Sequence, residues 1–224
     1  MCASSSADPD DPRYIRSRTA LRETMLAMCM ERRPDDISIS ELTRNAGVSR
    51  ATFYAHASSP VELLATALIA EFEPIFTPLG DVLTVNTANH LLRWREVYIE
   101  LLEHVSERSA IYCKLYCQKP ESAALGHLSD YFRSVIRHYV EDFAARSQEP
   151  ITDLWKALAT EQQVHNIVVI ITAWLDSGKA TTPETAINTF MSLAPPWQFA
   201  KFDDDGRVAL RRSRIIRQLA ADQD

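Results

Sequence analysis

The chain has 224 residues, of which 46% are hydrophobic and 24% charged, and this composition is typical of a soluble globular protein. Its net charge of -6 argues against non-selective coating of nucleic acid, because a negative field repels phosphate. The five glycines are isolated from one another, which excludes the glycine-rich phosphate loops of common nucleotide-binding enzymes. Neither a secretory leader nor a membrane-spanning run is evident, so we expect a cytoplasmic protein with no membrane association.

Four helices are predicted within the first seventy residues. A first helix buries one face through Leu21, Met25 and Cys29, and Arg33-Pro34 interrupts the pattern. Gly47 lies where a left-handed residue ends a helix, so a tight turn is expected between the second and third helices. The helices over 39–46, from residue 50 and over 60–72 each begin after a capping serine, namely Ser38, Ser49 and Ser59.

Prolines are expected to end the fourth helix, because Pro74 and Pro78 lack the backbone N–H that a helix interior needs. Further helical patterns follow at 90–106, 110–118, 123–146, 152–177 and 183–193, with one more predicted over 206–224. We therefore expect an all-α fold. Its parts are a disordered tail (1–12), an N-terminal three-helix helix-turn-helix domain (13–70) and a larger helical domain (71–224).

The third helix carries side chains that suit contact with DNA. Residues 13–70 contain eight arginines against six acidic residues, so this segment is locally positive. Arg50 supplies a cation for phosphate, and the hydroxyl and ring groups after it can donate to phosphate oxygens or base edges. The predicted DNA contacts are Ser49, Arg50, Thr52, Tyr54 and His56, with the capping hydroxyls of Ser38 and Ser59 also facing phosphate.

The segment 21–64 resembles the N-terminal helix-turn-helix domain of the TetR family of bacterial transcriptional regulators. The matching runs are Ser-Ile-Ser-Glu-Leu at 38–42, Ala-Gly-Val-Ser-Arg-Ala-Thr-Phe-Tyr-Ala-His at 46–56, and Glu-Leu-Leu at 62–64. Residues 166–193 resemble the C-terminal half of part of that family more loosely. Two departures stand out: Ala57 replaces a usual phenylalanine, and Pro60 replaces a lysine that often contacts phosphate.

This resemblance implies a homodimeric regulator, typically a repressor, that binds a near-palindromic double-stranded DNA operator and is released by a small-molecule effector. It also implies that the domain over 71–224 has a regulatory and dimerising role. The apolar residues expected at the dimer interface are Trp155, Leu158, Ile187 and Phe190. Those expected around a ligand cavity are Trp94, Tyr98, Tyr112, Tyr116, His165 and Trp174.

Two other functions remain open at this stage. A helical enzyme is conceivable around His104 with Glu107, but such pairs are common on helix surfaces and no nucleophile is marked. A protein-interaction module that has lost operator binding is a second alternative, supported by Ala57 and Pro60. The cysteines and histidines lack the spacing of metal ligands, so we expect neither a metal nor a cofactor.

Overall fold

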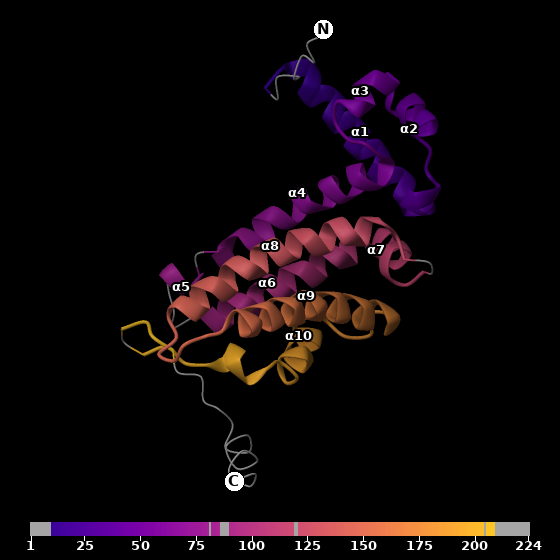
Figure 1. Ribbon diagram of the computed structural model, residues 1–224. Helices are drawn as coiled ribbons and strands as arrows, with labels where there is room; N and C mark the ends of the chain where they lie inside the picture. Colours follow the sequence, from indigo (N-terminus) through magenta and orange to yellow (C-terminus); the bar gives the residue numbers. More distant parts are fainter. Residues whose placement is uncertain (1–9, 81, 86–89, 119–120, 204, 209–224) are drawn as a thin grey trace.

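A computed structural model describes residues 10–80, 82–85, 90–118, 121–203 and 205–208 of the chain, and these form an all-helical protein (Figure 1). Within those ranges, β structure is limited to isolated bridges that join Val208 to Ser147 and to Phe202. The all-α prediction is confirmed. The helix expected over 206–224 and most of the expected N-terminal tail lie outside the described residues, but the end of that tail is helical, because Asp11 caps a helix that begins at Pro12.

The N-terminal domain is a small bundle whose core is closed by Phe53. It comprises α1 (Pro12–Glu31), the 3₁₀ turn η1 (Pro34–Asp36), α2 (Ile39–Ala46) and α3 (Arg50–Tyr54). The predicted face of α1 is buried, and Leu42 of α2 and Phe53 of α3 pack in the same core. Burial of one large side chain from each helix fixes α3 against α1 and α2.

Local caps explain where α2 and α3 begin and end. The hydroxyls of Ser38 and Ser49 accept hydrogen bonds from the backbone N–H groups of Glu41 (3.2 Å) and Thr52 (3.0 Å). Gly47 adopts the predicted left-handed conformation with φ of 67° and ends α2. The Glu41 carboxylate forms an ion pair with Arg32 at 2.6 Å.

Helix α4 (Pro60–Gly80) is longer than predicted, because it continues through Pro74 and Pro78. A proline interrupts the backbone ladder, but the buried side chains of Phe72, Phe76 and Leu79 hold the helical path against the rest of the protein. By length and composition alone α4 is apolar enough to cross a membrane. Its apolar residues instead form the central core of this fold, where α4 packs against α1, α6 and α8.

The larger domain is a bundle around the second half of α4 (Figure 1). Helix α8 lies along both α4 and α9, and α10 covers α6. The remaining elements are α5 (Val82–Val85), α6 (His90–Glu107), α7 (Ser109–Tyr116), α8 (Ala124–Ala145), α9 (Asp153–Asp176), α10 (Pro183–Met191) and the 3₁₀ turn η3 (Pro196–Phe199).

A half-buried carboxylate joins the two domains. Glu71 on α4 accepts hydrogen bonds from Arg22 on α1 (2.7 Å) and from two nitrogens of Arg108 at the start of α7 (2.6 and 2.7 Å). A second link runs from Lys114 on α7 to the carbonyl oxygen of Met30 at the end of α1 (2.7 Å). Helix α1 is therefore linked to α7 at two points, through Glu71 of α4 at one and directly at the other.

Candidate nucleic-acid interface

The outer surface of α3 presents Arg50 and Tyr54 to solvent. The Tyr54 side chain is 55% exposed, and its ring packs edge-on against the buried Phe53, 5.5 Å between centroids. Arg50 is exposed, and its guanidinium lies 3.5 Å from the hydroxyl of Ser40 on α2. No carboxylate among the described residues pairs with Arg50, so its charge is available to an external anion.

The predicted serine contacts act first as helix caps. Ser49 holds the N–H of Thr52 and also forms a hydroxyl–hydroxyl bond to Thr52 of 2.8 Å. Ser59 accepts a hydrogen bond from the N–H of Glu62, whose carboxylate in turn accepts from the N–H and hydroxyl of Ser58. Ser38 caps α2 as described above. These hydroxyls position α2, α3 and α4, and those of Ser38 and Ser49 remain on the exposed surface.

His56 is placed differently from the prediction of a free hydrogen-bond donor. His56 Nε2 shares a hydrogen bond of 2.8 Å with Ser17 Oγ, and the Ser17 hydroxyl also lies 3.0 Å from the Tyr14 carbonyl oxygen. The imidazole also packs on the Tyr14 ring, with 4.1 Å between centroids. Partial burial, together with the nearby Arg18, lowers the pKa of His56. His56 therefore anchors α3 to α1 as a neutral side chain.

The same contacts bring a second group of cations beside α3, which the predicted set of contacts omitted. Arg13, Arg16 and Arg18 are exposed on the first half of α1, around the Tyr14 and Ser17 side chains that touch His56. No carboxylate of the described residues forms an ion pair with them. The positive balance of residues 13–70 was the available signal, but only the packing of Tyr14 and Ser17 against His56 shows that this half of α1 lies beside the residues that follow α3.

The residues predicted to surround a ligand cavity do not form one group. Trp94, Tyr98, Tyr112, Tyr116 and Trp174 are buried in the bundle. His165 is exposed on α9, so the prediction that it faces an internal cavity is wrong for this arrangement. Tyr112 donates to or accepts from His104 (2.8 Å) near the junction with α4, whereas Tyr98 lies between Trp94 and Phe190.

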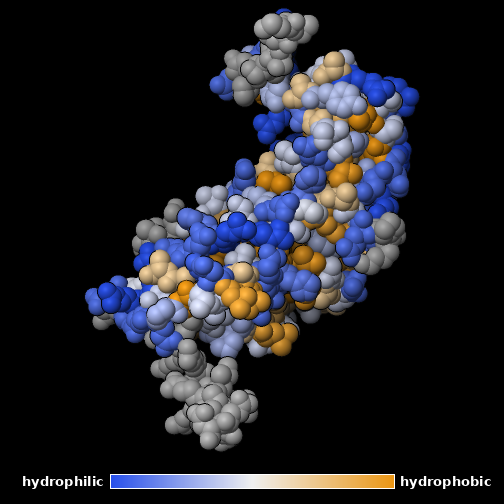
Figure 2. Space-filling model, in the orientation of Figure 1, coloured by the Kyte–Doolittle hydropathy of each residue, from blue (hydrophilic) through white to orange (hydrophobic). Residues whose placement is uncertain are grey.

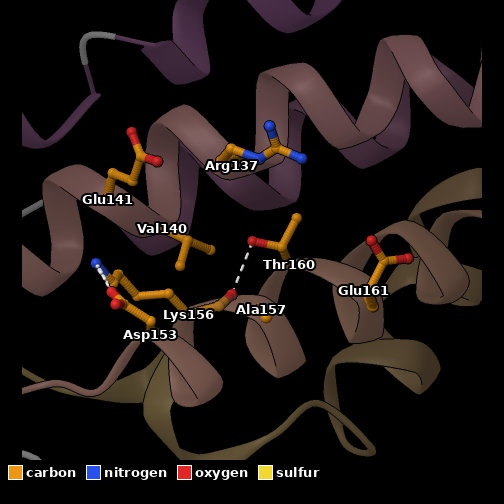
Figure 3. Close-up of a pocket in the computed structure, with 8 residues that line it drawn as sticks. All are labelled: Arg137, Val140, Glu141, Asp153, Lys156, Ala157, Thr160 and Glu161. Carbon is orange, nitrogen blue, oxygen red and sulfur yellow. Dashed lines mark hydrogen bonds and ion pairs between the residues drawn. The ribbon is translucent and has the colours of Figure 1, made fainter.

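A separate surface hollow of about 240 Å³ lies between α8 and α9 (Figure 3). Its polar groups are partly engaged with one another: Lys156 pairs with Asp153 at 2.6 Å, and the Thr160 hydroxyl donates to the Lys156 carbonyl. None of the predicted aromatic residues lines it. The full lining is Arg137, Val140, Glu141, Asp153, Lys156, Ala157, Thr160 and Glu161.

The predicted dimer contacts divide into buried and exposed residues. Ile187 and Phe190 are buried within the subunit, so they pack its core and do not reach a partner. Trp155 is half-buried against Phe143, with nearly parallel rings 6.0 Å apart. Leu158 is 63% exposed on α9. Figure 2 shows apolar surface over the α9 and α10 region, where the exposed apolar residues are Leu154, Leu158, Val169 and Leu193.

Comparison with known proteins connects this fold to transcriptional regulators. Residues 93–195 match a TetR-type family model described as a transcriptional regulator C-terminal region. The chain is also 26% identical over 182 residues to YxbF of Bacillus subtilis strain 168, described as an uncharacterised HTH-type transcriptional regulator. That alignment covers 81% of this chain and 45% of YxbF, so the chain spans about half the length of this relative.

Two solved structures share the fold at low sequence identity. One is native NalD of Pseudomonas aeruginosa, the secondary repressor of the MexAB-OprM multidrug efflux pump, with a TM-score of 0.57, 16% identity and coverage of 81% of this chain and 94% of NalD. The other is a TetR transcriptional regulator from Streptococcus agalactiae 2603V, with a TM-score of 0.55, 18% identity and coverage of 82% and 96%. Both pair a helix-turn-helix domain with a helical C-terminal domain.

Proposed function

Because this chain belongs to the TetR family of transcriptional regulators, we propose that it binds a near-palindromic DNA operator as a homodimer and represses transcription until a small-molecule effector binds. Members of this family are regulators and not enzymes, so the proposed activity is binding alone. The exposed, unpaired guanidinium of Arg50 beside Tyr54 on α3 is the observation that carries the proposal. We place this activity in the cytoplasm.

We assign different DNA contacts to α3 and α1. Arg50 and Tyr54 extend from α3 and suit base edges or phosphate, while Arg13, Arg16 and Arg18 extend from α1 and suit the flanking phosphates. Ser38, Ser49 and Ser59 cap the helix starts, and we assign their hydroxyls and that of Thr52 to contacts with the DNA backbone. His56 contributes by fixing α3 on α1.

A second copy of the chain would supply the second α3. The exposed apolar side of α9 supports this arrangement, since Leu154 and Leu158 are 69% and 63% exposed and occupy successive turns of one helix face. Covering these leucines in a symmetric pair removes apolar surface from water. A two-fold axis then relates two α3 helices, as a palindromic operator requires.

An effector acts only if it binds one arrangement of the dimer better than another. The contacts of Glu71 and Lys114 tie α1 of the DNA-binding domain to α7 of the bundle. A change in the bundle on effector binding would therefore reach the DNA-binding domain through these contacts. A shift of α7 displaces Arg108 and Lys114 together. Helix α1, which carries the proposed phosphate contacts, moves with them.

A mobility-shift titration of the full chain against DNA from upstream of its own gene tests the proposal. We expect saturable binding that prefers one sequence over scrambled DNA and weakens steeply with salt. Tyr54→Phe removes the exposed hydroxyl and should weaken binding without changing helix content. Tyr131→Phe on α8 is the matched control, because that half-buried tyrosine lies in the bundle.

Absence of sequence-selective binding at low salt would overturn the proposal in favour of a protein-interaction module. Equal affinities of the parent and the Tyr54→Phe variant would show that α3 does not face the operator through this residue. Sedimentation of the free protein tests the dimer separately: Leu158→Glu should yield monomers, whereas Leu92→Glu, at an exposed leucine on α6, should not.

A further inference from the structure

Two fully buried tyrosines of the bundle differ in hydrogen bonding: the hydroxyl of one has a partner and that of the other has none among the described residues. Tyr112 is 0% exposed and shares a 2.8 Å hydrogen bond with His104. Tyr98 is 1% exposed, and its hydroxyl has no hydrogen-bond partner among the described residues. A buried hydroxyl without a partner opposes folding, so natural cores rarely retain one without a reason.

The Tyr98 ring belongs to a series of ring contacts between residues that bury such atoms. It stacks on Trp94 with 5.6 Å between centroids, and Trp94 meets Tyr139 of α8 edge-on at 4.9 Å. The Trp94 indole N–H and the Tyr139 hydroxyl are both buried, and neither forms a hydrogen bond of good geometry. They do lie near enough for the N–H to oppose the rise that burial causes in the pKa of Tyr139.

Two amides extend this series toward α9. The Tyr139 ring lies 6.5 Å from Trp197 of η3, and the next residue, Gln198, donates to the Gln163 carbonyl oxygen at 2.9 Å. That bond uses one end of each amide. Gln163 Nε2 and Gln198 Oε1 are buried and have no partner within the described part of the chain.

The unpartnered atoms define a chemistry. Trp94 Nε1 and Gln163 Nε2 only donate, Gln198 Oε1 only accepts, and the two hydroxyls can do either. None of these five side chains carries a charge, and burial raises the pKa of Tyr98 and Tyr139, so both hydroxyls remain neutral. An anionic ligand would be desolvated here near the Asp142 carboxylate, whose charge already contributes to the raised pKa of Tyr139, at a high cost.

We propose that Trp94, Tyr98, Tyr139, Gln163 and Gln198 form the effector site, and that it takes an uncharged, planar molecule carrying both a carbonyl oxygen and an N–H group. The Trp94 and Tyr98 rings stack on each other, so a flat ligand would pack beside this pair, and its polar groups would satisfy the buried atoms. This inference rests on the proposed function in assuming that the regulator has an effector. It replaces the wider aromatic set expected from the sequence.

The first experiment compares Tyr98→Phe with Tyr112→Phe in the full chain by thermal unfolding. Tyr98→Phe removes an unpartnered hydroxyl and should raise Tm by roughly 2–4 °C. Tyr112→Phe removes a hydroxyl bonded to His104 and should lower Tm. If Tyr98→Phe lowers Tm as Tyr112→Phe does, the Tyr98 hydroxyl is already satisfied and the proposed site is wrong.

The second experiment uses benzamide as an uncharged probe and benzoate as its anionic isostere. At about ten times its Kd, benzamide should raise Tm of the parent protein by roughly 3–6 °C, while benzoate should have no effect. The benzamide effect should disappear in Tyr98→Phe with Gln198→Leu and persist in Tyr112→Phe. Equal effects of the two probes, or no effect of benzamide up to its solubility limit, would overturn the assignment.

Operator binding by the protein without any probe separates this inference from the proposed function. A parent protein that binds its operator but ignores benzamide refutes the effector site alone. A parent protein that is stabilised by benzamide but binds no operator refutes the proposed function and leaves the site in place.

Discussion

The N-terminal domain and the helical bundle differ in how their polar side chains are hydrogen-bonded. Around α2, α3 and α4, Ser38, Ser49 and Ser59 each satisfy a backbone N–H a few residues away, so these polar groups support structure at the surface. In the bundle, Tyr98 and Gln163 bury polar atoms that the described residues leave unpartnered. Among the described residues the unpartnered buried side-chain atoms therefore lie mostly in the bundle, although His56 Nδ1 is such an atom in the first domain.

The largest expected effect is on the outer surface of the first domain. Arg50→Ala removes an unpaired guanidinium from α3 and should cost about 1–3 kcal/mol of operator affinity per subunit. Arg133→Ala on α8 is the control: it removes the same charge, but that side chain pairs with Asp130 and Glu161. A fluorescence-anisotropy titration measures both. Equal losses would mean that net charge, and not α3, determines binding.

The next effect concerns the junction between the two regions. Glu71→Gln leaves the Arg22 and Arg108 charges without their shared carboxylate and should lower the free energy of unfolding by about 2 kcal/mol, below the full cost for a buried pair because both arginines are partly exposed. Urea unfolding measures the change. Glu161→Gln, which removes the exposed partner of Arg133, should cost at most about 1 kcal/mol. Comparable losses in the two variants would refute a special role for Glu71.

A smaller effect is expected from the turn before α3. Gly47 has a φ of 67° with open space around it, so Gly47→Ala should cost about 1–2 kcal/mol through backbone strain alone. Gly126→Ala within α8 is the matched control, and we expect the opposite effect on stability there. That site has no positive φ and no atom within 4 Å of an added methyl group. Thermal unfolding should show stabilisation of about 0.5–1 kcal/mol there. Destabilisation of both variants would contradict this reading.

The smallest expected effect is on how the free energy of unfolding depends on pH. Burial lowers the pKa of His104, helped by Arg108 and opposed by Glu71. As pH falls below about 6.5, the unfolded chain therefore binds a proton more readily than the folded chain, and stability decreases. His104→Gln should flatten this decline in urea titrations at pH 5 to 7.5. An unchanged slope in that variant would show that His104 does not cause it.

Local chemistry made the N-terminal domain predictable. A serine three residues before a free N–H and a glycine at a helix end specify caps without reference to the rest of the chain, and Ser49 and Gly47 behave as expected. The exposure of Arg50 and Tyr54 also follows from helical periodicity around Phe53. Partners distant in sequence were not predictable: Ser17 binds His56, and Arg22 binds Glu71 across 49 residues.

Tertiary packing explains the other differences. Pro74 and Pro78 predicted a break, but the buried side chains around them keep α4 helical. Ile187 and Phe190 were expected at a dimer interface because their helix is apolar, yet periodicity alone does not tell a subunit core from a shared one. The unpartnered atom of Gln163 has no sequence signature, because it depends on how η3 meets α9.

The two internal prolines give α4 an uneven stiffness along its length. Each removes one rung of the ladder, so the carbonyls of Ala70 and Pro74 lose their usual N–H donors, and both gaps lie in the half of α4 that is packed inside the bundle. The half from Pro60 to Ile69 retains every rung. Bending of α4 is therefore easier over 70–78 than over 60–69, where about 15 Å of uninterrupted helix leads to the N-terminal domain.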